Sequence, residues 1–425
     1  MAQKAIREFD AKRLLAKYIP EYSNNKFQIS KKIALVTLSR SLDELVGEEP
    51  WIKTEKLVVK PDQQIGKRGK LGLILLNATF EEAKKWINER MDKTITIGQV
   101  EGQLTHFLVE PFTEHDIEYY LAIKDHKNSD HVLFSTSGGV DIEENLGKVI
   151  TINVPIDKEI EEIDLRTPLS QQLSGKDLEK IEAFIKSIYK IYKELNFTFL
   201  ELNPFTIVGE NNFVLMDTKG RLDDTALFWM AKKWGGIEFP VPFGRSFNPE
   251  ESYIKELDNK TGASLKLMVL NPEGRLWTMV AGGGASIIYT DTIVDLGYGE
   301  QLANYGEYSG NPSRDETYEY AKTILDLMTR KRDPRGKILI IGGGIANFTD
   351  IAITFQGIIK ALRKFKGKLI ENNVKIYVRR GGPNFQEGLK QMKDLGREIG
   401  IPIEVHGPEM HLTRIVKIAL EGGTQ

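Results

Sequence analysis

The sequence predicts an α/β protein, and three observations support this fold class. In the C-terminal half, short apolar runs alternate with amphipathic segments, as expected for a parallel sheet covered by helices. Two glycine-rich segments, 280–286 and 340–349, lie in this half, and the second falls between an apolar run and a helical pattern. Nearer the N-terminus, the segment 176–195 places five large apolar residues on one helical stripe.

The composition excludes several classes of protein. The chain has 425 residues, of which 41% are hydrophobic, so it can form roughly two to four domains with proper cores. A net charge of −2 gives no sign of nucleic-acid binding, and the absence of cysteine excludes disulfides and cysteine metal sites. The charged segment 1–17 does not resemble a signal peptide, and no apolar run is long enough to span a membrane. We therefore expect a cytoplasmic protein.

The N-terminal half is expected to mix strands and helices. Apolar periodicity predicts helices over 5–18, 81–90 and 176–195. Short apolar runs predict strands over 57–59, 71–76, 107–110, 119–123, 197–202 and 213–216.

A domain boundary is expected at 234–248, where prolines and glycines are interspersed with aromatic residues. Beyond it, strands are predicted over 265–269, 277–280, 338–341 and 374–378, and helices over 317–328, 351–365, 385–399 and 412–420. Their alternation predicts a parallel α/β domain.

The second glycine-rich segment predicts an anion site. It lies between the buried strand 337–341 and the helix 351–365, so free backbone N–H groups and a positive dipole end are expected at the helix start. The pattern Gly342-x-Gly344-x-x-Asn347 lacks the third glycine of the dinucleotide fingerprint, and no acidic ribose partner follows. A nicotinamide site is therefore not expected.

A basic turn follows the strand that ends at Lys60. The turn, Gly66-Lys67-Arg68-Gly69-Lys70, could hold a polyphosphate through a lysine point charge and an arginine fork. A solvated basic hairpin explains the turn alone equally well, and it is not a Walker loop.

The segment Val109–Thr113 leads a strand into a proline. This leaves backbone groups free to meet a base edge, while Glu118 beyond it could accept ribose hydroxyls. Taken alone, an exposed glutamate in a β-hairpin is the commoner explanation.

Glu201, Asn203 and Asp217 suggest a metal site. Glu201 and Asn203 share one face of a strand, and Asp217 ends the next strand. Oxygen ligands from paired strands, completed by waters and phosphate oxygens, are the usual way to hold Mg²⁺ on a nucleotide. A polar turn with a buried asparagine is the alternative.

Arg379 and Arg380 follow the strand 374–378, at the end where parallel sheets bind ligands. Together with Asn347 and Thr349 across the crevice they describe a polycarboxylate site, although a surface arginine paired with a helix carboxylate would explain one arginine alone.

The six histidines have no metal-ligand spacing and lie outside the glycine-rich segments. We expect them to be structural or surface residues.

Taken together, the motifs from Lys60 to Asp217 resemble the ATP-grasp fold, and the C-terminal half resembles the flavodoxin-like ligase domain of the succinyl-CoA synthetases. The segments 57–63, 234–244, 262–267, 277–286, 302–310, 337–349 and 378–388 resemble the N-terminal region of the ATP-citrate lyases still more closely. The resemblance covers essentially the whole chain. It implies a two-part ATP-grasp domain, 1–110 and 111–242, followed by a ligase-type domain with a citrate site over 243–425.

The resemblance also implies site residues. ATP would be bound by Lys60, Lys67, Arg68, Gly69, Glu110, Pro111, Thr113 and Glu118. Mg²⁺ would be held by Asn203 and Asp217, and a further metal by Asp258, Thr261 and Ala263. Citrate would be bound by Gly310, Gly344, Ile345, Ala346, Asn347, Thr349, Phe365 and Arg380.

Two positions bear on the substrate. Ala281 replaces an asparagine of the succinyl-CoA synthetases, which suits a larger tricarboxylate, and Phe365 stands where the lyases have a tyrosine. The loss of this hydroxyl would weaken citrate binding by about 1 kcal/mol, unless a water molecule replaces it.

The family chemistry runs through a phosphohistidine, citryl phosphate and citryl-CoA. No histidine of this chain lies in the loop expected for phosphorylation, so no catalytic residue is expected here. The resemblance implies a hetero-oligomer in which a partner chain supplies the phosphohistidine, most of the coenzyme A site and the cleavage module. The large subunit of a citryl-CoA synthetase and a non-catalytic nucleotide sensor remain as alternatives.

Overall fold

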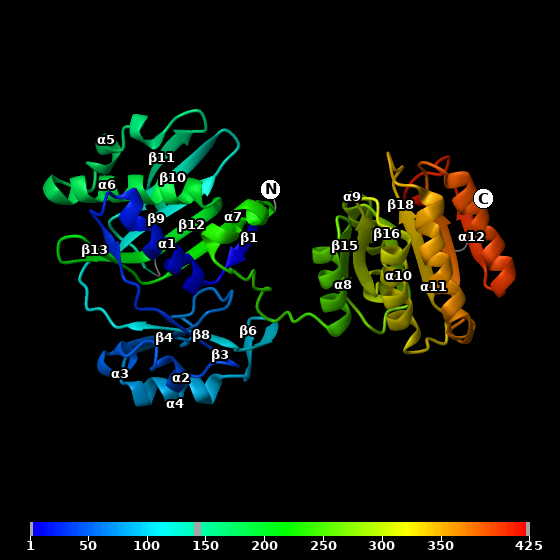
Figure 1. Cartoon of the computed structure of the whole chain (residues 1–425), viewed down its shortest axis with the longest axis horizontal. Helices are drawn as coiled ribbons and strands as arrows, with labels where there is room; N and C mark the ends of the chain where they lie inside the picture. Colours follow the sequence, from blue (N-terminus) through cyan, green and yellow to red (C-terminus); the bar gives the residue numbers. More distant parts are fainter. Residues whose placement is uncertain (1–2, 140–145, 422–425) are drawn as a thin grey trace. The chain divides into compact units, whose positions relative to one another are not determined.

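The computed structural model describes residues 3–139 and 146–421, and the chain divides into two compact units. Unit 1 comprises Met1–Ser246 and unit 2 comprises Phe247–Gln425, so the division falls inside the segment 234–248 (Figure 1). Helix α7 (Leu227–Trp234) ends at the start of this segment. Gly235 forms its C-cap with a left-handed φ of 67°, a conformation that favours glycine.

The smaller sheet of unit 1 is antiparallel, in the order β3-β8-β4-β5. Its strands are β3 (Ala34–Thr37), β4 (Leu57–Pro61), β5 (Leu75–Ala78) and β8 (His106–Pro111), and the helices around it are α2 (Leu42–Leu45), α3 (Trp51–Thr54) and α4 (Phe80–Arg90). Val59 and Val109 pair across its centre and are fully buried. This core fixes the ends of β4 and β8, where Lys60 and Glu110 lie. The hairpin β6 (Thr94–Ile97) and β7 (Val100–Gln103) stands beside it.

The larger sheet of unit 1 follows the path β1-β14-β12-β9-β10-β11. Its strands are β1 (Gln3–Ile6), β9 (Tyr119–Asp125), β10 (Ser129–Ser135), β11 (Ile150–Pro155), β12 (Phe197–Val208) and β14 (Thr218–Asp223); β13 (Asn212–Leu215) pairs with β12 and with β2 (Gln28–Ile29). Helices α1 (Glu8–Tyr22) and α6 (Gly175–Glu194) pack together, and α5 (Arg166–Leu169) precedes α6. Both long helices place their apolar stripes in the core of this sheet.

Two of the elements predicted in this unit are displaced. The segment 5–18 begins as strand β1, because Ile6 pairs with Gly220 of β14, and the helix begins only at Glu8. The strand predicted over 71–76 begins at Leu75 instead. Leu71 lies in a turn, where its N–H donates to the Lys67 and Arg68 carbonyls, and Gly72 takes a positive φ.

Unit 2 contains the predicted parallel sheet, in the order β16-β18-β19-β20. Its strands are β16 (Leu276–Ala281), β18 (Ile338–Gly343), β19 (Lys375–Arg379) and β20 (Ile403–His406). Alternate residues enter two different cores: Leu339 and Ile341 of β18 face one, and Ile338 and Ile340 face the other. Both faces are therefore covered, which explains the continuous apolar runs in the sequence.

The helices of unit 2 lie on both sides of this sheet. Helices α10 (Arg314–Thr329), α11 (Ile351–Glu371) and α12 (Phe385–Ile399) lie side by side in one layer (Figure 1). Helices α9 (Gly283–Asp295) and α13 (Arg414–Glu421) contribute to the other core. The antiparallel pair β15 (Ser264–Val269) and β17 (Asn304–Ser309) lies next to α8 (Pro249–Lys260) and β16.

Sequence reasoning missed α8 and α9. Helix α8 carries a capping box between Asn248 and Glu251 with Pro249 at its first turn, a pattern that would have revealed it. Helix α9 has no comparable cap, and its apolar residues Ile287, Ile288 and Val294 are exposed, so its periodicity is weak. Among residues 3–139 and 146–421, no helix is both long enough and apolar enough to cross a membrane.

Candidate functional site

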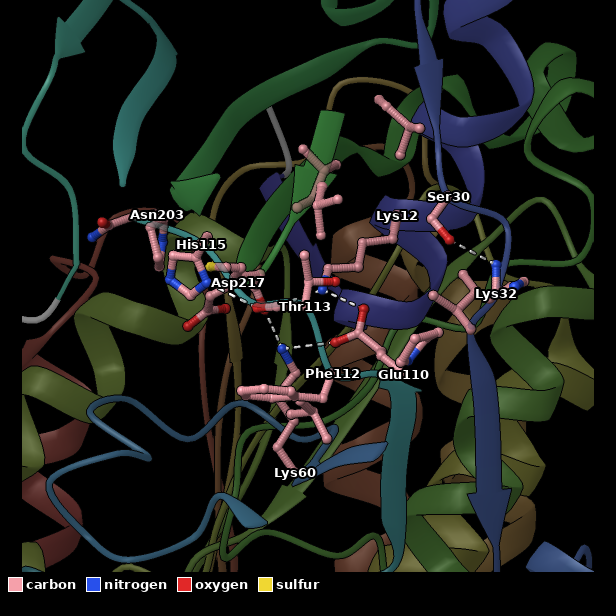
Figure 2. Close-up of a pocket in the computed structure, with 18 of the residues that line it drawn as sticks. Lys12, Ser30, Lys32, Lys60, Glu110, Phe112, Thr113, His115, Asn203 and Asp217 are labelled. Atoms are coloured by element: carbon pink, nitrogen blue, oxygen red, sulfur yellow. Dashed lines mark hydrogen bonds and ion pairs between the residues drawn. The ribbon is translucent and has the colours of Figure 1, made fainter. Parts of the chain in front are cut away.

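Unit 1 contains a cavity of about 1470 Å³. Both sheets of the unit contribute to it: Lys60 from the end of β4, Glu110 from β8 and Asn203 from β12 (Figure 2). Every residue predicted to bind ATP lines this cavity, as do the predicted Mg²⁺ ligands Asn203 and Asp217. Folding therefore brings together residues that are up to 157 positions apart, from Lys60 to Asp217.

Lys60 is buried between two carboxylates. Its ammonium lies 2.7 Å from Oε1 of Glu8 and 3.0 Å from Oε2 of Glu110, and it also donates to the Met216 carbonyl. Burial opposes the charge, but the two glutamates raise the pKa of Lys60 above its ordinary value. The lysine therefore stays charged at the cavity wall.

Arg68 connects the basic turn with the predicted metal site. Its Nη2 lies 2.6 Å from Oε2 of Glu8 and 2.8 Å from Oδ1 of Asp217, and its Nη1 donates to the Pro61 carbonyl at 2.8 Å. Although burial opposes the charge, Glu8 and Asp217 raise the pKa of Arg68. The turn is thus anchored by a buried ion pair, and the solvated hairpin considered above does not describe Arg68.

Two members of this site were missed by sequence reasoning, Glu8 and Lys12 of α1. Lys12 lies 2.8 Å from Oε1 of Glu8. It also lies 2.6 Å from Oε1 of Glu110 (Figure 2). Burial raises the pKa of Glu8, but Lys12, Lys60 and Arg68 outweigh it and hold that pKa well below its usual range. The sequence feature that could have revealed them is their i,i+4 spacing as a Glu–Lys pair next to the apolar stripe of the helix.

These six side chains form what we call the charge cluster: Glu8, Lys12, Lys60, Arg68, Glu110 and Asp217. The cluster contains three cations and three carboxylates, so its formal charge is zero. Such a balanced, buried set holds its lysines and arginine in fixed positions, where the oxygens of a polyphosphate can replace carboxylate oxygens as acceptors.

The segment after β8 forms another part of the cavity wall. Pro111, Thr113 and Glu118 line it, and His115 links the last two: Nδ1 lies 2.9 Å from the Thr113 carbonyl and Nε2 lies 3.1 Å from Oε1 of Glu118. Burial lowers the pKa of His115, but these two contacts raise it overall. His115 is exposed, as expected of a surface residue, and it also lines the cavity (Figure 2).

Asn203 and Asp217 are neighbours in space. The Asn203 N–H donates to the Asp217 carbonyl at 3.0 Å, and Oδ1 of Asn203 accepts from Gly139 N–H at 2.7 Å. An amide oxygen and a carboxylate at the same cavity wall are a fitting donor set for Mg²⁺, which takes its other ligands from water and phosphate. Glu201 is directed to Lys219 instead, at 2.6 Å.

Unit 2 contains a pocket of about 320 Å³ at the carboxyl ends of β16 and β18. The residues predicted for citrate that line it are Gly310, Gly344, Ile345, Ala346, Asn347, Thr349 and Arg380. Ala281 also lines it, at the position where the sequence suggested space for a larger substrate. The parallel sheet thus gathers these segments at one edge, as expected for this type of fold.

The two adjacent arginines differ in their surroundings. Arg379 is held by backbone carbonyls, at 2.9 Å from both Gly343 and Met410. Arg380 lines the pocket and is only 4% exposed; its Nη1 donates to the Gly344 carbonyl at 2.5 Å, while its Nε has no hydrogen-bond partner among the described residues. Burial lowers the pKa of Arg380, and the groups that act on its charge are Tyr308, Tyr289 and Arg379, none of which is a carboxylate. The site is therefore suited to an incoming anion.

Helix α11 begins at Ile351, where the sequence predicts it. Strand β18 continues to Gly343, two residues beyond the predicted strand, and residues 344–350 connect it to the helix. Asp350 caps this helix by accepting the Ile353 N–H at 3.0 Å, because a carboxylate is favourable at a helix N-terminus. Residues 344–349 line the pocket as a loop.

Phe365 does not lie with the other residues predicted for citrate. It is fourteen positions after the first residue of α11, a distance of roughly 21 Å along a helix. Its side chain is 8% exposed and belongs to the hydrophobic core of unit 2, with the Lys368 ammonium 5.4 Å from the ring centroid. The structure therefore places Phe365 in the core and outside the lining of this pocket.

Of the three residues expected to hold a further metal, Asp258 already has structural partners. The Asp258 carboxylate accepts the Leu265 N–H at 2.8 Å and lies 2.6 Å from the Lys266 ammonium. The Thr261 hydroxyl is buried and has no hydrogen-bond partner among the described residues, and Ala263, two positions further along the chain, is buried. Within the described ranges, no group of three or more His, Cys, Asp or Glu side chains is arranged to hold a metal ion.

Comparisons with known proteins cover both units. The family model of the ATP-citrate synthase ATP-grasp domain matches residues 2–234, and the ATP citrate lyase citrate-binding model matches residues 245–422. The ATP-citrate synthase alpha chain protein 2 of Oryza sativa subsp. japonica is 50% identical over 421 residues, which are 99% of each chain. The ATP-citrate synthase of Bos taurus is 49% identical, and this chain spans only 38% of its length.

A solved structure of an ATP citrate lyase also matches the chain over both units. The structure of ATP citrate lyase from Methanothrix soehngenii in complex with citrate and coenzyme A is 52% identical and superimposes with a TM-score of 0.91. The match covers 99% of this chain and 100% of that one. The chain therefore belongs to the ATP-citrate lyase family, whose ATP-grasp and citrate-binding domains it contains.

Proposed function

We propose that this chain is the ATP- and citrate-binding subunit of a heteromeric ATP-citrate lyase. The complete enzyme would convert ATP, citrate and coenzyme A into ADP, phosphate, acetyl-CoA and oxaloacetate. ATP and Mg²⁺ would occupy the cavity of unit 1, and citrate the pocket of unit 2. A partner chain would supply the phosphohistidine, most of the coenzyme A site and the cleavage module.

One observation carries the assignment of citrate to unit 2. Arg380 is a buried cation whose Nε lacks a partner among the described residues, and it lines a pocket inside the region that matches the citrate-binding model. A buried, uncompensated guanidinium is costly, and a carboxylate supplies the bidentate partner that it lacks. Asn347 and Thr349 line the same pocket and add an amide and a hydroxyl for further carboxylate groups.

The charge cluster supports the assignment of ATP to unit 1. Lys60 and Arg68 would neutralise the phosphate oxygens, and Asn203 with Asp217 would hold Mg²⁺ against them. Glu118 would accept a ribose hydroxyl, and the backbone of Pro111 and Thr113 would frame the base. The metal supplies charge neutralisation on the phosphoryl group when it is bound.

The proposed division of labour rests on two kinds of relative. This chain matches 38% of the length of the Bos taurus relative, whereas it matches 99% of the rice alpha chain. A subunit of the rice type would need a second chain for the rest of the reaction. Purified alone, this chain should bind citrate and ATP but form no acetyl-CoA; adding the partner should restore turnover.

The binding test is calorimetric titration of the full chain with citrate and then with succinate. We expect citrate to bind, succinate to bind far more weakly, and Arg380→Ala to abolish citrate binding. Arg363→Ala is the matched control, because Arg363 pairs with Glu398 on the exposed faces of α11 and α12. Absence of citrate binding by the wild-type chain, or binding that survives Arg380→Ala, would overturn the proposal.

A further inference from the structure

We propose that Tyr308 is a second recognition residue of the unit 2 pocket and donates its hydroxyl hydrogen to the same ligand carboxylate that Arg380 binds. The inference rests on the proposed function and deepens it, because it names a residue that would set affinity for the polycarboxylate. The tyrosine was not among the residues that the sequence pointed to.

The position of Tyr308 brings it to the pocket. It is the second-last residue of β17, two residues before Gly310, and it lines the pocket together with Arg380. It is 1% exposed, and its ring packs against that of Tyr320 with centroids 5.7 Å apart. The ring is therefore fixed by the core, and only the hydroxyl is left to meet a ligand.

The hydroxyl of Tyr308 is buried and has no hydrogen-bond partner among the described residues. The neighbouring Tyr320 shows what a purely structural tyrosine does in this core: its hydroxyl donates to the Lys266 carbonyl at 2.9 Å. Buried polar groups are nearly always satisfied, so an unpaired hydroxyl at a pocket wall indicates a partner that comes from outside the chain.

Arg380 Nε is the second unpaired polar atom of the same pocket. Arg380 and Tyr308 line the same pocket, and the charge of Arg380 acts on the Tyr308 hydroxyl. An arginine has no acceptor, and burial raises the pKa of Tyr308 to about 12, so the hydroxyl keeps its proton and serves as a donor at neutral pH. Two adjacent donors, one of them cationic, require an anion with two acceptor atoms, and a carboxylate meets this requirement.

The test compares Tyr308→Phe with the wild-type chain by calorimetric titration. The ligands are citrate and tricarballylate, which has the three carboxylates of citrate without its hydroxyl. We expect Tyr308→Phe to lower the affinity for both ligands by a similar factor, roughly 10- to 100-fold, because a hydrogen bond to a charged group is lost. Tyr305→Phe is the matched control on the same strand, three residues earlier and partly exposed, and should change neither affinity by more than about twofold.

Thermal unfolding is a second measurement, and it distinguishes a ligand-binding hydroxyl from a structural one. Removing a buried, unpaired hydroxyl should leave the melting temperature of the ligand-free chain unchanged or raise it. The increase in melting temperature on adding citrate should become smaller in Tyr308→Phe. A lower melting temperature without ligand would show that the hydroxyl has a structural partner, and would contradict the inference.

The outcomes separate this inference from the proposed function. If the wild-type chain does not bind citrate, the proposed function fails. If the wild-type chain binds citrate and Tyr308→Phe binds it equally well, only the role of Tyr308 fails. A loss confined to citrate, with tricarballylate unaffected, would show that Tyr308 meets the citrate hydroxyl and would overturn the carboxylate assignment.

Discussion

The Lys12 ammonium lies 2.6 Å from Oε1 of Glu110, although the two residues are 98 positions apart in the chain. This ion pair connects helix α1 with the end of β8, and Lys60 holds the other oxygen of the same carboxylate at 3.0 Å. This wall of the cavity is thus built around one glutamate with a lysine on each side.

Lys12→Met should therefore destabilise unit 1. The substitution leaves Glu8 and Glu110 buried with one fewer cation, and breaking a buried ion pair from one side costs about 3–5 kcal/mol. Urea denaturation measures this loss. Lys17→Met, on the same helix but exposed, should change the unfolding free energy by less than about 0.5 kcal/mol. Equal stability of the two variants would show that Lys12 is dispensable.

Lys60→Met should reduce the affinity for magnesium-bound ATP analogues. The ammonium would be the charge-assisted donor nearest to the transferred phosphate, and its loss should weaken binding at least about tenfold. Calorimetric titration with a non-hydrolysable ATP analogue measures this effect, with citrate binding as an internal reference. Lys56→Met, exposed just before β4, is the control; an unchanged nucleotide affinity in Lys60→Met would remove Lys60 from the site.

Asp62 should make stability depend on pH between pH 4 and pH 6. Its two carboxylate oxygens accept the N–H groups of Glu8 and Phe9 at 2.8 and 3.1 Å, and so cap α1 from the segment after β4. Burial, followed by the charge of Glu8, raises the pKa of Asp62 from 3.8 to about 6. The folded state then binds more protons than the unfolded state in this range, so the free energy of unfolding falls as the pH rises.

The size of this contribution is about 3 kcal/mol for a shift of about two pKa units. Asp62→Asn cannot titrate, so its stability relative to the wild type should improve as the pH rises from 4 to 6. Urea midpoints of both proteins over this range give the difference directly. A difference that stays constant with pH would mean that Asp62 remains ionised throughout.

Asp217→Asn should raise the Mg²⁺ concentration needed for nucleotide binding. Asp217 is the carboxylate of the proposed metal pair, and it also lies 2.8 Å from Arg68. Because an amide replaces a charged ligand, we expect the Mg²⁺ requirement to rise roughly tenfold or more. Titration of Mg²⁺ at fixed analogue concentration measures it, with Glu210→Gln in an exposed turn as the control. An identical Mg²⁺ dependence would place the metal elsewhere.

Gly343→Ala should impair citrate binding through Arg380. Gly343 has a φ of 155°, and an added Cβ would stand 2.8 Å from Nη1 of Arg380 and 2.9 Å from the Ala281 carbonyl. The arginine would have to move, so citrate affinity should fall by roughly tenfold or more. Gly284→Ala is the control, since nothing lies within 4 Å of its added Cβ. Unchanged citrate affinity in Gly343→Ala would show that Arg380 can adjust.

The sequence by itself determined the features that depend on local periodicity and on recognisable motifs. The parallel sheet of unit 2 was evident because strands buried on both faces produce continuous apolar runs, as in 338–341. The ATP-grasp and citrate-binding domains were also predicted from the resemblance of the motifs around Lys60, Asn203 and Arg380, and the family models match both regions.

Only the tertiary structure decided how the charges are paired. Glu8 and Lys12 look like an ordinary helical ion pair in the sequence, and their contacts with Lys60, Arg68 and Glu110 depend on how α1 packs against the two sheets. The same holds for Tyr308, whose unpaired hydroxyl is visible only once its burial is known, and for Phe365, which turns into the core of unit 2. Periodicity is a property of neighbouring residues, whereas hydrogen bonding and burial depend on residues that only folding brings together.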